Sequence, residues 1–424
     1  MKFIVCCDPM LKFLLHRSLI GELSEYADSH PVQQFLNNEK LEPADVGQFV
    51  DALTAVEIQL VEADQFYNII PFRKYVGIPG VVQGLLNILQ DGGHEVFIVS
   101  SDAPYQQQLQ DLVNPRENLD NVRCIASLNM DENEDFNNFI LKTYQLPVYP
   151  LTFAILLSKW VKNFTFAPHA PQTFYIPEGE NISSYINEIK ALAREHGIKY
   201  LFLKDEFGFN SGAAVPYFIA PVDDVDTYCQ LFYEKSRGVA NLGGLVLEEF
   251  LAQQGGIDIY KSHYFGEIIP GECIHYHVDL NPFEGGAPYE QVIAGISEEP
   301  AEFPTGMVDL MNPVIERFYP YCFASVDCIL SDGTPKIIDL NSMAGSLGYV
   351  QQLRNENRGN PFEFFLEHVE KSDNYAAYAA QKEYRANILA MYDSIRKVGP
   401  SFISGERLVS LDSGAERVVE ELFF

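Results

Sequence analysis

The sequence predicts an α/β amino-terminal domain, a mixed α+β central region and a helical carboxy-terminal extension. Up to about residue 150, buried apolar runs alternate with helical patterns; from about residue 151, strands alternate with loops and a few helices; after about residue 371, a long helical pattern follows. An alternation of strands with helices is typical of α/β domains, and the less regular order that comes next is typical of α+β domains.

The composition is that of a globular protein with a strongly acidic surface. The 424 residues include 29 Lys and Arg against 59 Asp and Glu, which gives a net charge of −30. This length allows two or three domains, each with its own core. Because such a surface repels nucleic acid and anionic membranes, we expect neither as a partner, whereas a small phosphate ligand needs only a few local donors.

The cysteines and the apolar runs favour a cytoplasmic location. The seven cysteines are an odd number without CxxC spacing, and a disulfide between the adjacent Cys6 and Cys7 would be strained. This pattern is typical of reduced, buried cysteines. Residues 1–7 are too short a run for a signal peptide, and two prolines and a lysine interrupt the apolar run at 146–160, so we expect no membrane-spanning helix.

The first 150 residues predict an α/β unit with a helical insertion. Apolar runs of strand length lie at 2–7, 94–102 and 121–129, and residues 81–93 show a helical pattern that ends in two glycines. Roughly residues 10–75, between the first strand and that helix, are expected to be mostly helical.

Residues 77–104 of this unit resemble the second motif of haloacid dehalogenase-type phosphatases, in which a Ser or Thr ends a strand. Those phosphatases also need Asp-x-Asp after the first strand. Here Asp8 is followed two residues later by Met10. The missing acid argues against phosphatase activity and leaves a fold remnant or a Rossmann-like domain.

The remaining elements follow from period and from turn residues. The helix at 181–197, for example, has Asn181 or Ser183 as its N-cap and Gly197 as its stop. Further helices are expected at 150–163, 222–237, 360–371 and after 374, and strands near 173–176 and at 199–205, 213–219, 244–251, 275–280, 323–330 and 336–341.

Two strand ends carry groups that suit a nucleotide. The strand at 199–205 ends beside Lys204, and the loop after it contains Gly208 and Gly212. A lysine next to a glycine-bearing loop can hold phosphate oxygens while backbone N–H groups close over them. The strand at 244–251 ends in Glu248 and Glu249, where backbone groups at a hinge could contact an adenine edge.

Polar residues on two later strands suggest a magnesium site. Asp339 and Asn341 share one face of their strand, and Asp327 lies in the preceding strand. Oxygen ligands of this kind are those that magnesium prefers. A two-residue turn at Asp332-Gly333 would pair Val326 with Asp339 and turn Asp327 to the other face. Joint ligation therefore requires an odd loop, such as 332–334, or a β-bulge.

The order of these three motifs resembles the ATP-grasp superfamily, and in particular carboxylate–amine ligases such as D-alanine–D-alanine ligase. The resemblance covers roughly residues 150–370. It implies a Rossmann-like domain over 1–150, a small ATP-grasp lobe over 151–245, a large lobe with the metal site over 246–370, and a carboxy-terminal extension over 371–424.

The resemblance also implies roles for individual residues. Lys204 and its loop would bind the phosphates of ATP, the backbone of the hinge would bind adenine, Asp258 would bind the ribose, and Asp327, Asp339 and Asn341 would bind magnesium. The residues implied to contact the nucleotide are Lys159, Lys204, Gly208, Ser211, Gly212, Glu248, Glu249, Phe250 and Asp258.

The sequence departs from the family pattern at two positions. Asp339 replaces the more usual Glu, and Ser325 stands where many members have an Arg that stabilises the phosphorylated intermediate. Lys261, Arg317 or His277 could supply the missing positive charge, and the sequence does not choose among them. Arg354, after the metal-binding strand, is a candidate for contact with a substrate carboxylate.

These observations predict an ATP-grasp ligase that uses ATP and magnesium and acts on a small molecule or a peptide. An ATP-grasp kinase and a catalytically inactive nucleotide-binding protein remain as alternatives, and a homodimer is left open. His275 and His277 share a strand face and could ligate a metal, although substrate contact or packing is favoured, because no Cys or third His lies nearby in the sequence.

Overall fold

The computed structural model describes the parts of the chain that carry most of these predictions. The predicted residues Gly208, Ser211, Gly212 and Arg354, and Asp8 of the phosphatase-like motif, lie outside them. The described residues are 1–7, 11–12, 15, 30–67, 78–100, 105–113, 119–126, 134–151, 154–207, 217–236, 243–251, 256–270, 273–281, 285–331, 333–342 and 361–423.

The amino-terminal region forms a parallel sheet in the order β2-β1-β3-β4, as an α/β unit requires. Side chains of the central strand β1 alternate between two cores, with Phe3 and Val5 on one side and Ile4 and Cys6 on the other. The bounds are β1 Lys2–Cys7, β2 Glu95–Ser100, β3 Val122–Ile125 and β4 Val148–Tyr149, with helices α3 His30–Leu36, α4 Val46–Tyr67, α6 Ile78–Asp91, α7 Tyr105–Leu112 and α8 Glu134–Phe139.

A second sheet has the order β12-β7-β6-β8-β5-β16-β17-β18. Helices α10 (Ile186–Glu195) and α11 (Val225–Ser236) pack on it through a shared apolar core. The strands are β5 Thr173–Ile176, β6 Tyr200–Asp205, β7 Phe218–Pro221, β8 Leu245–Glu249, β12 Ala287–Pro288, β16 Ser401–Ser404, β17 Arg407–Ser410 and β18 Glu416–Val418. The predicted helix at 150–163 is a 3-10 turn, Ala154–Leu157, followed by α9, Lys159–Thr165.

A third, antiparallel sheet has the order β13-β11-β9-β14-β15, with β10 paired to β9. Helix α13 (Thr305–Phe318) packs on the face that carries Val326 and Cys328. The other elements are β9 Gly256–Phe265, β10 Glu267–Ile268, β11 Ile274–Leu280, α12 Tyr289–Val292, β13 Ile293–Pro300, β14 Phe323–Ser331 and β15 Thr334–Ser342. Neither β9 nor α13 was identified in the sequence.

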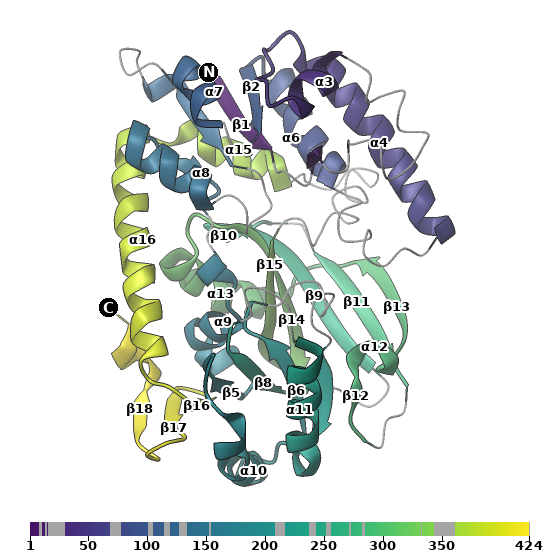
Figure 1. Cartoon of the computed structure of the whole chain (residues 1–424), viewed down its shortest axis with the longest axis vertical. Helices are drawn as coiled ribbons and strands as arrows, with labels where there is room; N and C mark the ends of the chain where they lie inside the picture. The colour runs from purple at the N-terminus through teal and green to yellow at the C-terminus, as the bar shows by residue number, and fades with distance from the viewer. Residues whose placement is uncertain are drawn as a thin grey trace.

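The carboxy-terminal helices connect the three sheets. After α15 (Pro361–Lys371), the long helix α16 (Asn374–Arg396) runs along one side of the molecule from the amino-terminal region to β16–β18 (Figure 1). The predicted combination of α/β, α+β and a helical extension is therefore confirmed, although strands β16–β18 also belong to the second sheet.

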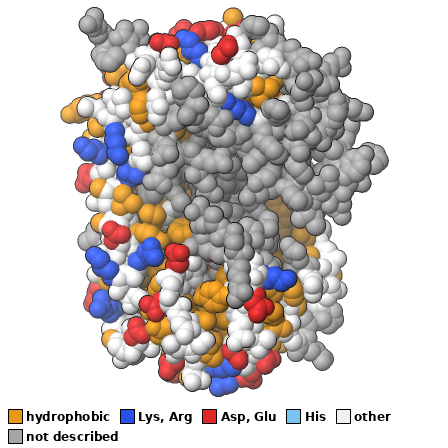
Figure 2. All heavy atoms as spheres, in the orientation of Figure 1, with side chains coloured by type: hydrophobic (Ala, Val, Ile, Leu, Met, Phe, Trp, Pro, Cys, Tyr) orange, Lys and Arg blue, Asp and Glu red, His pale blue; other side chains and the backbone are white. Residues whose placement is uncertain are grey.

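Two observations concern the charges on the surface and the apolar character of the helices. On the face shown in Figure 2, acidic and basic side chains of the described residues are interspersed, so they form no continuous basic surface there. Among the helices that the structure describes, none is both long and apolar enough to cross a membrane.

Candidate nucleotide-binding site

A β-bulge places the three predicted metal-binding residues on one face of the third sheet. Near the turn, Ser331 pairs with Thr334 and Cys328 pairs with Ile337; the register then shifts by one residue, so that Asp327 pairs with Asp339. The additional residue is Ile338. Because paired residues of neighbouring strands share a face, Asp327, Asp339 and Asn341 lie together, and the condition stated for the sequence is met through a bulge.

Lys261 lies in the same row of this sheet. It pairs with Asp327 across β9 and β14, and its Nζ lies 3.2 Å from Asp327 Oδ1. Asn341 Nδ2 donates a hydrogen bond of 2.9 Å to Asp327 Oδ2. Burial raises the pKa of the Asp327 carboxyl, Lys261 lowers it, and the charge of Asp339 raises it further. The face therefore carries two mutually repelling carboxylates, one carboxamide and one cation.

The donor set fits a magnesium ion that a nucleotide also ligates. Within the described parts of the chain, no group of three or more His, Cys, Asp or Glu side chains could hold a metal ion. Two carboxylates and a carboxamide supply oxygen only, and magnesium in proteins commonly completes its shell with phosphate oxygens and water. The set is thus unsuited to a closed structural metal centre.

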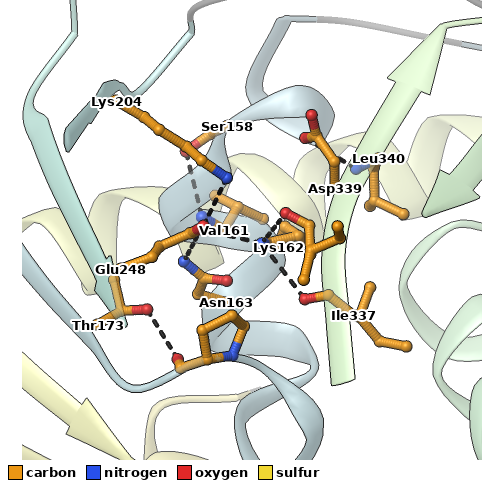
Figure 3. Close-up of polar contacts among 12 residues, drawn as sticks. Ser158, Val161, Lys162, Asn163, Thr173, Lys204, Glu248, Ile337, Asp339 and Leu340 are labelled. Carbon is orange, nitrogen blue, oxygen red and sulfur yellow. Dashed lines mark hydrogen bonds and ion pairs between the residues drawn. The ribbon is translucent and has the colours of Figure 1, made fainter. Parts of the chain in front are cut away.

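Facing this sheet, two buried lysines share one buried carboxylate. Glu248 of β8 is 2% exposed, and its Oε2 accepts a hydrogen bond of 2.6 Å from Lys204 Nζ of β6. Its Oε1 accepts from Lys162 Nζ at 3.0 Å and from Asn163 Nδ2 at 2.7 Å, both on α9. Figure 3 shows Lys162 and Lys204 converging on Glu248. It also shows the carboxylate of Asp339 nearby, on strand β15 of the third sheet.

The charges in this cluster act on one another between the second and third sheets. Burial alone would raise the pKa of Glu248, but the two lysines outweigh it and lower the pKa to about 2. Burial lowers the pKa of Lys162 to about 8, against the charges of Glu248 and Asp339. The same two carboxylates outweigh burial at Lys204 and raise its pKa. Lys162 Nζ also lies 2.8 Å from the oxygen of Ile338, the residue before Asp339, and Figure 3 shows Asp339 beside the two lysines, so the acidic sheet face and the lysine cluster form one site.

Lys162 is a site residue that sequence reasoning missed. Besides Glu248, its Nζ donates to the backbone oxygens of Ile338 at 2.8 Å and of Ile337 at 3.4 Å, so it joins α9 to the edge of β15. Its spacing of three residues from Lys159 puts both on one side of a helix, which was a usable signal. Lys159 is also buried. The pKa of Asp205 is raised to about 6, because burial, which raises it, outweighs the charge of Lys159, which lowers it.

The hinge at Glu248–Phe250, where strand β8 ends, offers fewer free backbone N–H groups to an adenine than expected. The N–H of Glu249 donates to Gln172 O at 2.7 Å, and the N–H of Phe250 donates to Tyr200 O at 3.0 Å. An adenine edge at this hinge would therefore have to use carbonyl oxygens and the amide of a later residue, Leu251. Phe250 and Leu251 pack against an apolar cluster centred on Ile257, Val278 and Ile329, which provides a surface for a flat base.

Asp258 does not face the site. In β9 it alternates with Ile257 and Ile259, which are on the face of Lys261, so Asp258 lies on the opposite face. There it is held by His277 Nδ1 at 2.7 Å and by His275 Nε2 at 2.9 Å. The ribose role predicted for Asp258 is therefore corrected, and the two histidines are paired with carboxylates rather than arranged as metal ligands.

Two of the three candidate cations are also excluded by position. Arg317 belongs to α13, on the face opposite Asp327, and its guanidinium lies over the rings of Phe318 and Phe423 at 4.9 and 5.3 Å. His277 pairs with Asp258 and shares its face. Of the three, the structure leaves Lys261 beside the carboxylates.

A separate cavity of about 660 Å³ lies between β4, the β9–β10 turn, α13 and α16. Its walls include Tyr149, Phe265 and Tyr321, and none of the residues predicted to bind the nucleotide or the metal. The candidate site is therefore the face between the second and third sheets and not this cavity.

Comparison with known proteins gives matches in structure. No family model matches the chain, and no curated protein matches it in sequence. A D-alanine–D-alanine ligase from Bacillus anthracis is similar at 12% identity and a TM-score of 0.46, over 90% of this chain and 99% of that chain. The D-cycloserine synthetase DcsG is similar at 11% identity and a TM-score of 0.40, over 84% and 99%.

A third match is a RimK-domain ATP-grasp protein from Sphaerobacter thermophilus, at 12% identity and a TM-score of 0.41, over 68% of this chain and 94% of that chain.

Proposed function

We propose that this chain is an ATP-dependent carboxylate–amine ligase of the ATP-grasp type. The observation that carries the proposal is the pairing of two walls. On one side Lys162 and Lys204 share Glu248; on the other the face of Asp339 begins next to Ile338, whose oxygen accepts a hydrogen bond from Lys162 Nζ at 2.8 Å. A wall with excess positive charge opposite an oxygen-only acidic face suits the phosphates of a nucleotide with its magnesium.

The nucleotide would lie across both walls. Its base would rest at the hinge against Phe250 and Leu251, and its phosphates would reach Lys204 and Lys159. Asp327, Asp339 and Asn341 would hold magnesium, which when bound neutralises phosphate oxygens and aligns the transfer. Lys204 is the lysine best placed to exchange partners, because Lys162 is also engaged by two backbone oxygens.

The proposed reaction has two steps. A substrate carboxylate oxygen attacks the γ-phosphorus, and the bond from this phosphorus to the β–γ bridging oxygen breaks. ADP departs, and the substrate becomes an acylphosphate. An amine then attacks the acyl carbon, the bond to the phosphate oxygen breaks, and phosphate departs as the nitrogen loses a proton. The acid and the amine would come from an amino acid, a peptide or a small carboxylic acid, in the cytoplasm.

Lys261 would supply the positive charge that Ser325 cannot. Its Nζ lies 3.2 Å from Asp327, in the row of the sheet next to Ser325. A fixed cation near the transferred phosphoryl group stabilises the charge that develops in the transition state. This contact favours an active enzyme over a nucleotide-binding protein that has lost catalysis.

Product analysis separates the ligase from its alternatives. The protein is incubated with magnesium–ATP and pools of amino acids and organic acids, and ADP, free phosphate and new phosphorylated compounds are measured. A ligase gives ADP and phosphate in equal amounts only when acid and amine are both present. A kinase gives ADP and a stable phosphorylated product, and binding without turnover identifies an inactive binding protein.

A further inference from the structure

A second buried carboxylate lies behind the lysine cluster. Glu206 is 1% exposed, and its Oε1 accepts hydrogen bonds from Ser158 Oγ at 2.7 Å and from Tyr392 Oη at 3.1 Å. Its Oε2 accepts from Tyr175 Oη at 2.8 Å and from the N–H of Gly244 at 2.9 Å. Four donors directed at two oxygens match an ionised carboxylate, which only accepts hydrogen bonds.

The partners of Glu206 belong to the elements that carry the lysines and Glu248. Ser158 is the N-cap of α9 and accepts from the N–H of Val161, so it fixes the first turn of the helix with Lys159 and Lys162. Gly244 directly precedes β8, the strand of Glu248; its oxygen accepts a hydrogen bond from the N–H of Glu206, and its own N–H donates to the Glu206 carboxylate. Glu206 itself follows β6, the strand of Lys204.

One partner comes from the far end of the chain. Tyr392 lies in the last turns of α16, and polar side chains of the same helix bind β4 of the first sheet and helix α13. Gln381 binds both the N–H and the oxygen of Val148 in β4, and Tyr384 Oη donates to Phe318 O of α13 at 2.7 Å. Along its length, helix α16 therefore binds β4 of the first sheet, helix α13, which packs on the third sheet, and Glu206 at the end of β6 in the second sheet.

We propose that Glu206 is a positioning residue for the phosphate-binding lysines, and that Tyr392 makes the carboxy-terminal helix part of the nucleotide site. Glu206, at the end of β6, is hydrogen-bonded to Ser158 at the start of α9 and to Gly244 at the start of β8, and so fixes the distances between these elements. The hydroxyls of Tyr392 and Tyr175 fix the position of the Glu206 carboxylate. The effect on nucleotide affinity rests on the proposed function; the effect on the order of α9 does not.

The only tryptophan of the sequence, Trp160, reports on this network. It lies in α9 between Lys159 and Lys162, fully buried, and its ring stacks on Tyr175 with 4.6 Å between centroids and 8° between planes. A change in the Glu206–Tyr175 contact therefore changes the surroundings of the indole directly.

The test compares Tyr392→Phe with Tyr384→Phe. Both variants remove one buried tyrosine hydroxyl from the same helix, but Tyr384 donates to a backbone oxygen of α13 and not to Glu206. In nucleotide-free protein, Tyr392→Phe should speed amide hydrogen exchange over residues 158–166 and shift Trp160 emission. Tyr384→Phe should do neither, at a similar loss of thermal stability.

Magnesium–ATP titration supplies the second readout. We expect Glu206→Gln, which keeps the side-chain shape, to weaken affinity about tenfold, and Tyr392→Phe to weaken it by a smaller factor. Equal exchange and emission in the two tyrosine variants would overturn the proposal. If the wild type binds no magnesium–ATP, the proposed function fails, while the exchange and emission measurements still decide whether Glu206 positions α9.

Discussion

The shared carboxylate of Glu248 should be the most costly charge to remove from this protein. In Glu248→Gln the side chain keeps its volume and one acceptor, but Lys162 and Lys204 lose the negative charge that lies 3.0 and 2.6 Å from their Nζ atoms. Removing one partner from a buried ion pair costs about 3–5 kcal/mol, because the remaining charge stays desolvated.

The pKa of Glu248 leads to a similar figure. Its fall from 4.5 to about 2 in the folded protein corresponds to about 3 kcal/mol of favourable interaction with the ionised form. Since whole domains have about 5–15 kcal/mol of stability, the variant should fold but unfold at clearly lower denaturant concentration. Urea unfolding followed by Trp160 emission measures the difference.

The loss of folding stability caused by Glu248→Gln should become smaller as the pH rises. Burial already lowers the pKa of Lys162 from 10.5 to about 8, and without Glu248 it should fall further. At pH values between the Lys162 pKa of the variant and that of the wild type, the folded variant binds fewer protons than the folded wild type. The stability of the variant therefore rises more steeply with pH. Comparing unfolding at about pH 7 and about pH 9 tests this sign.

Glu249→Gln is the matched control, because Glu249 is the adjacent carboxylate and is only partly buried, with Gln172 Nε2 3.2 Å away. It should change stability by less than about 0.5 kcal/mol. The reasoning is refuted if the two variants lose the same small amount, or if the deficit of Glu248→Gln is independent of pH.

Three further predictions follow from the same contacts. Lys204→Ala should weaken magnesium–ATP binding markedly in calorimetry while far-ultraviolet circular dichroism stays unchanged; unchanged affinity would remove Lys204 from the site. Lys261→Met should lower turnover by about a hundredfold with little change in ATP affinity, and a loss of affinity without loss of turnover would contradict its role. Because the folded pKa of Glu248 is depressed, its contribution to wild-type stability is complete above pH 4.5 and is lost as the pH falls toward about 2; acid titration of wild type against Glu248→Gln should show this loss in the wild type alone.

The motifs of the third sheet could be predicted because strand alternation is local. Asp339 and Asn341 share a face in any regular strand, and only the partner strand was uncertain. The sequence left an odd loop and a bulge as equal alternatives for Asp327. The bulge at Ile338 is set by pairing with β14, and no residue pattern in β15 identifies it.

The misassigned residues depended on elements that were not recognised. Arg317 was considered without α13, which places it on the far face, and Asp258 without β9, whose register decides the direction of its side chain. Lys162 and Glu206 were missed for another reason. Their partners, Glu248 and Tyr392, lie 86 and 186 residues away along the chain, so only tertiary packing reveals them.

The central claim is that Asp327, Asp339 and Asn341 form the magnesium face of an ATP site, and the melting temperature of Asp339→Asn tests it most directly. Without ligand the variant should melt close to the wild-type temperature, because the substitution removes both the repulsion between Asp339 and Asp327 and the attraction of Asp339 to Lys162 and Lys204. With magnesium–ATP at a hundred times its dissociation constant, the wild type should gain about 2.7 kcal/mol, and the variant much less. Equal stabilisation of both proteins by magnesium–ATP, or a large loss of stability in the ligand-free variant, would contradict the account.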